Sequence, residues 1–257
     1  MTLRNVAAPT LLSLRYSPWS ERARWALDHH ELVYRLVQHE PFLGERRLRK
    51  VVGPRVERPT VPVLVTEGEV LCDSWDIARY ADNHGDAEKL IPASLEGAIR
   101  ELGELAERTM VETRGLVTAA LLASDAALDE NAPRFVPTWL GPLFRPLVRY
   151  GTRWFARKYS LELSELATQR RALARTLTTF RERYGDRPYL FERFSYADII
   201  FCSLLQAVKP VDDRYIRLGP AWRIAWTQPA LAEEFDDLIR RRDELYAAHR
   251  GRRKKPE

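Results

Sequence analysis

The feature that most constrains how this chain folds is a change in hydrophobic periodicity between residues 83 and 93. Before it, short apolar runs such as residues 61–65 alternate with helix-like stretches. After Ser94, apolar side chains recur at steps of three and four residues, the period of an amphipathic helix. We therefore predict an α/β domain over residues 1–85 and an all-helical domain over residues 94–257.

Within the first domain, strand and helix signals predict the order βαβαββα. Ser17 and Pro18 have the residue types of a helix N-cap and a first helical position, so a helix should begin there. Glu67, Gly68 and Glu69 separate two apolar runs and indicate a hairpin. We expect strands over 11–14, 33–37, 61–66 and 70–72, and helices that begin near residues 18, 45 and 73.

The second domain is predicted to consist of amphipathic helices around one apolar helix. Ser195 and Asp198 have the spacing of a capping box directly before residues 199–205, which are apolar on most faces. That helix should form the centre of the domain. A single last helix is expected over residues 229–246.

Residues 133–159 do not follow this pattern. Prolines at 133, 137, 142 and 146 argue against a regular helix before about Leu147. Arginines at 145, 149, 153 and 157 are spaced so that they would share one stripe on a helix. We expect this segment to be an irregular connection with a solvated basic flank.

Composition excludes several classes of protein. The net charge of +5 is spread over 41 basic and 36 acidic residues, so nucleic-acid binding is not expected. The basic run over residues 250–255 should be a solvated, mobile tail. Neither a membrane-spanning stretch nor a leader is evident, which favours a cytoplasmic protein without membrane association. Cys72 and Cys202 stand far apart and the histidines are scattered, so no disulfide and no metal site is expected.

Four separated motifs resemble, in order, those of the cytosolic glutathione S-transferase superfamily, and the resemblance covers nearly the whole chain. Residues 16–27, YSPWSERARWAL, look like the serine-type turn and first helix of its tau, delta and related bacterial classes. Residues 60–64, TVPVL, are similar to the segment before the family's third strand. Asp73-Ser74 matches an acidic-serine pair at the third helix, and the capping box of Ser195 and Asp198 is the fourth motif.

The resemblance implies a thioredoxin-like first domain, glutathione as co-substrate, a hydrophobic electrophile and a homodimer. It assigns the glutathione thiol to Ser17. Lowering the thiol pKa by ~2 from about 8.5 requires ~2.7 kcal/mol of preferential thiolate stabilisation, which a hydroxyl at a helix N-terminus is suited to supply. The alternative is that Ser17 only caps the helix. Tyr16 and Ser20 are the competing hydroxyls.

Other positions follow from the same resemblance. Pro62 would be cis and would present the Val61 backbone to the cysteinyl part of glutathione. Ser74 and the helix-start amides would bind the γ-glutamyl carboxylate, and Asp73, where the family more often has glutamate, would bind the ammonium. Helix capping and an ordinary trans proline are the alternatives.

A cation is needed for the glycyl carboxylate, and Lys50 is preferred over Arg49 and Arg58. Ser17 and Ser20 stand where thioredoxins and glutaredoxins carry a Cys-Pro-x-Cys pair, so dithiol exchange at this turn is excluded. The aromatic residues of 133–159 are alternatively expected to wall an electrophile pocket, with the arginines attracting an anionic substrate, partner or membrane surface. Conjugation, dehalogenation, ether cleavage, isomerisation and peroxide reduction all fit, and a non-catalytic glutathione-fold binding protein is the alternative.

Overall fold

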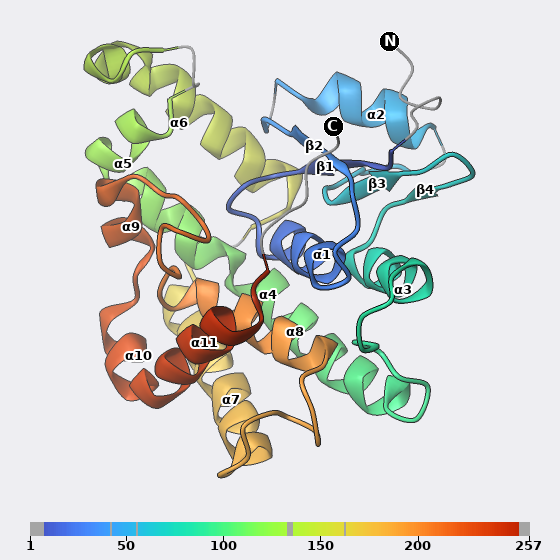
Figure 1. The fold of residues 1–257 in the computed structure, drawn as a ribbon. Coiled ribbons are helices and arrows are strands. Elements are labelled where there is room, and N and C mark those ends of the chain that lie inside the picture. The colour runs from blue at the N-terminus through green and yellow to red at the C-terminus, as the bar shows by residue number, and fades with distance from the viewer. Residues whose placement is uncertain (1–7, 42, 55, 133–135, 162, 252–257) are drawn as a thin grey trace. The chain divides into compact units, whose positions relative to one another are not determined.

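The computed structural model describes residues 8–41, 43–54, 56–132, 136–161 and 163–251 (Figure 1). It divides into two compact units, each made of more than one segment. Unit 1 comprises Met1–Leu102, Arg187–Ser203 and Glu244–Glu257, and unit 2 comprises Gly103–Asp186 and Leu204–Asp243. The limits predicted for two domains, 1–85 and 94–257, stay a prediction.

Unit 1 contains a four-stranded mixed sheet. Its strands are β1 (Thr10–Ser13), β2 (Arg35–Gln38), β3 (Val63–Val65) and β4 (Val70–Leu71). The order across the sheet is β2-β1-β3-β4, with β2 parallel to β1 and the other neighbours antiparallel. Helices α1 (Pro18–His29), α2 (Glu45–Val52) and α3 (Ser74–His84) complete the predicted order βαβαββα. This thioredoxin-like fold followed by helices confirms the predicted fold class.

Helix α2 covers one face of this sheet, and α1 and α3 cover the other (Figure 1). Leu12 of β1 packs with Leu48 of α2 and with Val63 and Val65 of β3. Leu11, the neighbouring residue, is fully buried as well. Because successive strand residues point to opposite faces, a continuous apolar run is what a sheet covered on both sides requires.

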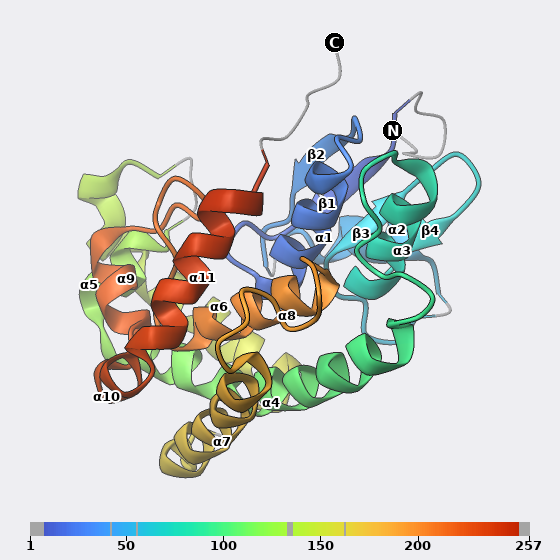
Figure 2. The same cartoon turned by 60° about the horizontal axis from the view of Figure 1, so that its bottom comes forward.

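Two C-terminal segments complete unit 1. Helix α8 (Tyr196–Leu204) begins with the predicted capping box: Ser195 N and Oγ donate to Asp198 Oδ2 at 2.9 and 3.0 Å. Asp198 Oδ1 also accepts from Leu190 N at 3.0 Å. The end of α11 (Asp236–His249) lies beside α1 in both Figure 1 and Figure 2, where Trp25 Nε1 donates to His249 O at 3.1 Å.

Unit 2 is helical. It contains most of α4 (Glu96–Ala123), then α5 (Asp125–Glu130), the 3₁₀ turn η1 (Thr138–Leu140), α6 (Gly141–Lys158), α7 (Leu166–Tyr184), a second 3₁₀ turn η2 (Leu205–Ala207), α9 (Pro220–Trp226), α10 (Pro229–Glu234) and the first part of α11. Long helices α4 and α7 meet at a hydrogen bond of 2.7 Å between the Thr109 and Thr176 hydroxyls. In the described part of the chain, no helix is both long and apolar enough to cross a membrane.

Two expectations about unit 2 are wrong. Helix α6 begins at Gly141 rather than after Leu147, because Pro142 occupies its first turn and only Pro146 lies inside it. The predicted last helix is two helices, since α10 ends at Glu234 and α11 begins at Asp236. Phe235, at the break, is fully buried, and the sequence has no glycine or proline there to mark the end of α10.

The arginine stripe of α6 is only partly a solvated flank. Arg145 binds Asp125 and Asp129 through Nη1 and Nη2 at 2.7 and 2.6 Å. Arg149 binds Asp125 at 2.6 Å and donates to Leu122 O at 3.1 Å. These two arginines therefore attach α6 to α5. Arg153 and Arg157 are exposed.

Candidate glutathione site

Sheet register brings three of the predicted site segments to one end of the sheet. Because β3 is antiparallel to β1, with Leu12 opposite Val63, the residues just before β3 lie beside the end of β1 from which the Ser17 turn leaves. Strand β4 returns antiparallel to β3, so residues 73–74 that follow it reach the same end. Three segments thus meet at the same end of the sheet: the turn at 15–17, the segment 61–62 and the start of α3.

Ser17 is the N-cap of α1. Its Oγ accepts a hydrogen bond from Ser20 N at 3.4 Å, and its side chain is almost wholly buried. Among the described residues its O–H makes no hydrogen bond, so the proton remains available to an acceptor. The helix N-terminus adds a partial positive charge at the same place, which favours an anion.

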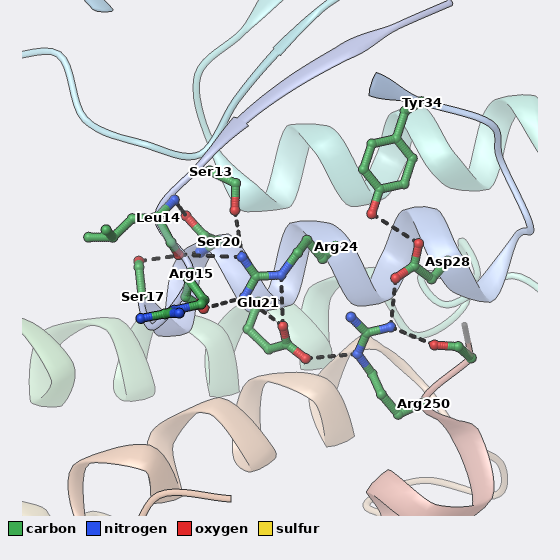
Figure 3. A network of polar contacts seen from close by, with 11 residues as sticks. Ser13, Leu14, Arg15, Ser17, Ser20, Glu21, Arg24, Asp28, Tyr34 and Arg250 are labelled. Carbon is green, nitrogen blue, oxygen red and sulfur yellow. Dashed lines mark hydrogen bonds and ion pairs between the residues drawn. The ribbon is translucent and has the colours of Figure 1, made fainter. Parts of the chain in front are cut away.

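The competing hydroxyls differ in position. Ser20 is fully buried in the first turn of α1, and its Oγ accepts from Leu14 N at 3.1 Å (Figure 3). Ser20 thereby ties the end of β1 to α1 and faces the interior. Tyr16 lies half-buried in the turn between them. The N-cap geometry consequently favours Ser17 over Ser20 as the group that meets a ligand.

The segment before β3 and the start of α3 complete this end of the sheet. The Val61–Pro62 peptide bond is cis, as the resemblance implies. Asp73 is exposed and caps α3 by accepting from Trp75 N at 2.6 Å. Ser74 is buried at the first position of α3, and its carbonyl accepts from the Tyr196 hydroxyl at 2.9 Å. Capping therefore occupies one oxygen of Asp73 and leaves its carboxylate at the surface.

Charge at this end of the sheet is negative around α3. Burial, followed by the carboxylates of Asp76 and Asp73, raises the pKa of the Cys72 thiol. Cys72 is therefore held protonated, which argues against it as a nucleophile. Two exposed carboxylates beside a buried serine suit a ligand that carries an ammonium group.

Lys50 is the cation predicted for the glycyl carboxylate. It lies exposed on α2, and its ammonium makes no hydrogen bond or ion pair with any described residue. Helix α2 is fixed to the sheet by Leu48. The alternative cations differ, since Arg49 donates to Glu57 O at 3.5 Å and Arg58 is exposed.

A buried charge network runs along α1, and Figure 3 shows its members pointing toward one another. Glu21 accepts from Arg24 at Oε2, at 2.9 Å from Nε and 2.7 Å from Nη2, and from Arg250 Nε at Oε1, at 2.7 Å. Arg250 Nη1 also binds Asp28 Oδ2 at 2.7 Å. We call Glu21, Arg24, Asp28 and Arg250 the α1 charge network.

This network reaches the turn that bears Ser17. Arg24 Nη1 donates to Ser13 Oγ at 2.5 Å and to Leu14 O at 3.4 Å, and its Nη2 donates to Arg15 O at 2.8 Å. Burial raises the pKa of the Glu21 carboxyl, but the opposing effects of Arg250 and Arg24 are together larger, so the pKa is lowered. Glu21 is therefore ionised at neutral pH.

Arg250 was not predicted from the sequence. The basic run was expected to be solvated, yet the Arg250 side chain is only 10% exposed. The expectation was wrong for this residue because its partners lie 229 and 222 positions earlier in the chain. Periodicity and capping rules describe near neighbours, so they carry no signal for such a pair. Residues 252–255 of the run lie outside the described residues.

Comparison with known proteins agrees with this geometry. Residues 11–89 match the family described as glutathione S-transferase, N-terminal domain. A probable glutathione S-transferase of Solanum tuberosum is 31% identical over 87 residues, which are 34% of this chain and 39% of that protein. This match thus spans about two fifths of the relative's length.

Solved structures share the fold at low identity. Glutathione transferase GSTFuA3 from Phanerochaete chrysosporium is 15% identical with a TM-score of 0.65, covering 95% of this chain and 98% of that one. The glutathione S-transferase CsGST63524 of Ceriporiopsis subvermispora, solved in complex with glutathione, is 16% identical with a TM-score of 0.60, covering 93% and 95%. Residues 11–89 are thus similar to the N-terminal domain of glutathione S-transferases, and the chain shares the fold of these two solved glutathione transferases.

Proposed function

We propose that this protein binds glutathione at the end of the sheet formed by the Ser17 turn, residues 61–62 and the start of α3, and transfers it to a hydrophobic electrophile. The observation that carries the proposal is the Ser17 hydroxyl at the N-terminus of α1, with an O–H that no described residue accepts. A thiolate placed there would accept a hydrogen bond from that O–H and lie at the positive end of the helix.

Each part of glutathione then has a partner. The Val61 backbone is proposed to pair with the cysteinyl residue, because Val61 lies at the same end of the sheet as the Ser17 turn. Ser74 and the first amides of α3 would bind the γ-glutamyl carboxylate, while Asp73 would bind the ammonium. Lys50 is proposed for the glycyl carboxylate. Tyr16 would line the thiol side without activating it, while Ser20 would hold the turn in place from the interior.

The remaining assignments are proposals at the level of the family. The relative from Ceriporiopsis subvermispora was solved with glutathione bound, which supports glutathione as the co-substrate of this chain. We propose a homodimer that works in the cytoplasm in detoxification, with helical side chains shaping the electrophile pocket. A non-catalytic glutathione-binding protein is the competing function, and it differs in one measurable property, the pKa of the bound thiol.

The test is the ultraviolet absorbance of the thiolate of bound glutathione against pH, in wild type and in Ser17→Ala. We expect a thiol pKa well below about 8.5 in wild type and a return toward that value in Ser17→Ala. Ser124→Ala is a matched control, because Ser124 caps α5 by accepting from Ala127 N at 3.2 Å. It should lose a similar cap and leave the thiol pKa unchanged.

Other outcomes would reject the proposal. Bound glutathione with an unshifted pKa in wild type would favour the non-catalytic alternative. An equal shift in wild type and Ser17→Ala would remove Ser17 as the activating group, and Tyr16→Phe would then be measured in the same way.

A further inference from the structure

The α1 charge network connects the last described residues to the turn that bears Ser17. Arg250 stands just after α11, and its guanidinium also lies 5.8 Å from the centre of the Trp25 ring. Its two carboxylate partners, Glu21 and Asp28, are seven positions apart, which is about two turns of α1. The Arg250 side chain thus binds α1 at two places, about two turns apart, after the Ser17 cap.

Glu21 couples the two ends of this network. Its carboxylate is 1% exposed, and each oxygen accepts from a different arginine. If Arg250 were removed, Oε1 would be a buried acceptor without a donor, which is costly. The Glu21 side chain would have to rotate, and Arg24, which also binds the carbonyls of the turn, would follow it.

We propose that Arg250 is a positioning residue for the β1–α1 turn, so that thiol activation at Ser17 depends on the C-terminal end of the chain. This inference rests on the proposed function. Its physical basis is a continuous path of hydrogen bonds and ion pairs from Arg250 through Glu21 and Arg24 to the carbonyl of Arg15, two residues before Ser17.

The experiment compares Arg250→Gln and Arg250→Lys with Arg240→Gln in the full chain. Arg240 is a suitable control, because it lies on α11 and its side chain is 68% exposed in an ion pair with Asp236. In Arg250→Gln we expect the pKa of bound glutathione thiol to rise and kcat/KM to fall about tenfold or more, because small displacements at a reacting group are costly. Arg250→Lys should restore part of both, and Arg240→Gln should match wild type.

Amide hydrogen exchange supplies a second readout that needs no glutathione chemistry. Exchange over residues 15–20 should accelerate in Arg250→Gln, and less so in Arg250→Lys, which also serves if the glutamine variant does not fold. Unchanged exchange and an unchanged thiol pKa in folded Arg250 variants would overturn the inference. Faster exchange in a protein whose wild type does not shift the thiol pKa would instead reject the proposed function and retain the positioning role.

A different observation, in unit 2, concerns the outer face of α6. Trp139, Leu143, Leu147 and Tyr150 are 77%, 73%, 49% and 52% exposed. On a helix, the last three fall within about 60° of one another. Val148, Thr152 and Ala156 form the opposite, buried face. Helix α6 therefore has one buried face and, opposite it, an apolar face that is exposed to solvent, which is unusual for a surface helix.

Charge indicates what this outer face meets. Residues 141–158 contain no acidic side chain, and two exposed cations, Arg153 and Arg157, follow the apolar stripe. A second copy of the chain would bring its own Arg153 and Arg157 against a helix that offers no carboxylate. An anionic lipid surface complements both the apolar stripe and the cations. We infer that α6 docks flat on an anionic membrane surface.

Co-sedimentation with vesicles tests this inference. Wild type should sediment with vesicles of phosphatidylcholine mixed with phosphatidylserine, and less with phosphatidylcholine alone or at high salt. The double variant Leu143→Ser with Leu147→Ser should bind the vesicles with an affinity lower by about tenfold or more. Arg153→Gln with Arg157→Gln should remove the preference for phosphatidylserine. Ile224→Ser is the control, because Ile224 is an apolar residue of unit 2 that is 77% exposed.

Three results would overturn it. Wild type that sediments with neither vesicle has no such surface. Equal loss of binding in Ile224→Ser would show a non-specific apolar effect. Sedimentation velocity that shows a wild-type dimer dissociating in the Leu143→Ser, Leu147→Ser variant would assign the face to a second copy of the chain.

Discussion

At the scale of single residues, the α1 charge network shows how buried charges are arranged beside the candidate site. Two arginines face two carboxylates, so the group is neutral as a whole. Burial alone would lower the pKa of the Arg250 guanidinium, but the carboxylates of Glu21 and Asp28 outweigh burial and raise it. Glu21 and Arg250 therefore keep their charges because of their neighbours, whereas burial raises the pKa of the Asp28 carboxyl. Removing one member leaves a buried partner unbalanced.

We predict that Glu21→Gln lowers the free energy of unfolding by about 3–5 kcal/mol, the typical cost of breaking a buried pair. Arg24 and Arg250 would then face a neutral amide while remaining buried. Urea denaturation followed by tryptophan fluorescence measures this, since Trp25 lies in the same unit. Arg240→Gln, at an exposed pair, should change stability by less than about 0.5 kcal/mol. Equal effects in the two variants would contradict the argument.

At the scale of elements, the sequence predicted helix starts that depend on near neighbours in the chain, but not irregularities that depend on distant contacts. Ser17 with Pro18 and Ser195 with Asp198 mark helix starts through hydrogen bonds that span three residues, so the sequence contains the whole interaction. The irregularities were missed for physical reasons. The break at Phe235 falls at a fully buried ring, and no glycine or proline marks it in the sequence. The early start of α6 is stabilised by Arg145, whose partners are on α5.

The capping box of α8 gives a prediction at this scale. Asp198→Ala should lower the free energy of unfolding by about 3 kcal/mol, because it removes a cap and leaves Leu190 N and Ser195 N buried without an acceptor. Asp73→Ala, which removes an exposed cap that accepts one hydrogen bond, from Trp75 N, should cost about 1 kcal/mol. Chemical denaturation measures both. Similar losses of unfolding free energy in the two variants would contradict the argument that a buried cap stabilises the protein more than an exposed one.

At the scale of the whole molecule, unit 1 joins segments that are far apart in the chain. Tyr246 and His249 of α11 contact Trp25 and Phe194, with ring centres 4.4 Å apart for Trp25 and Tyr246 and 4.0 Å for Phe194 and His249. The motifs around the sheet predicted where the candidate site lies. No pattern in the sequence predicted which helix would return to α1, because that choice depends on packing across more than 220 residues.

This junction makes stability depend on pH. Burial, and then the nearby His29, lowers the pKa of His249 below its ordinary value of 6.5. A histidine with a lowered pKa binds protons better when unfolded, so its contribution is complete above about pH 6.5 and is lost as the pH falls below that value. The melting temperature should therefore fall between about pH 7.5 and about pH 5.5, and less steeply in His249→Gln.

Tyr189→Phe, which removes the hydroxyl 2.9 Å from His249 Nε2 but leaves the imidazole, should keep a steeper slope than His249→Gln. If His249→Gln retains the full wild-type slope, the imidazole at this junction does not set the acid sensitivity, and the other buried titratable groups of unit 1, His29 first, must account for it.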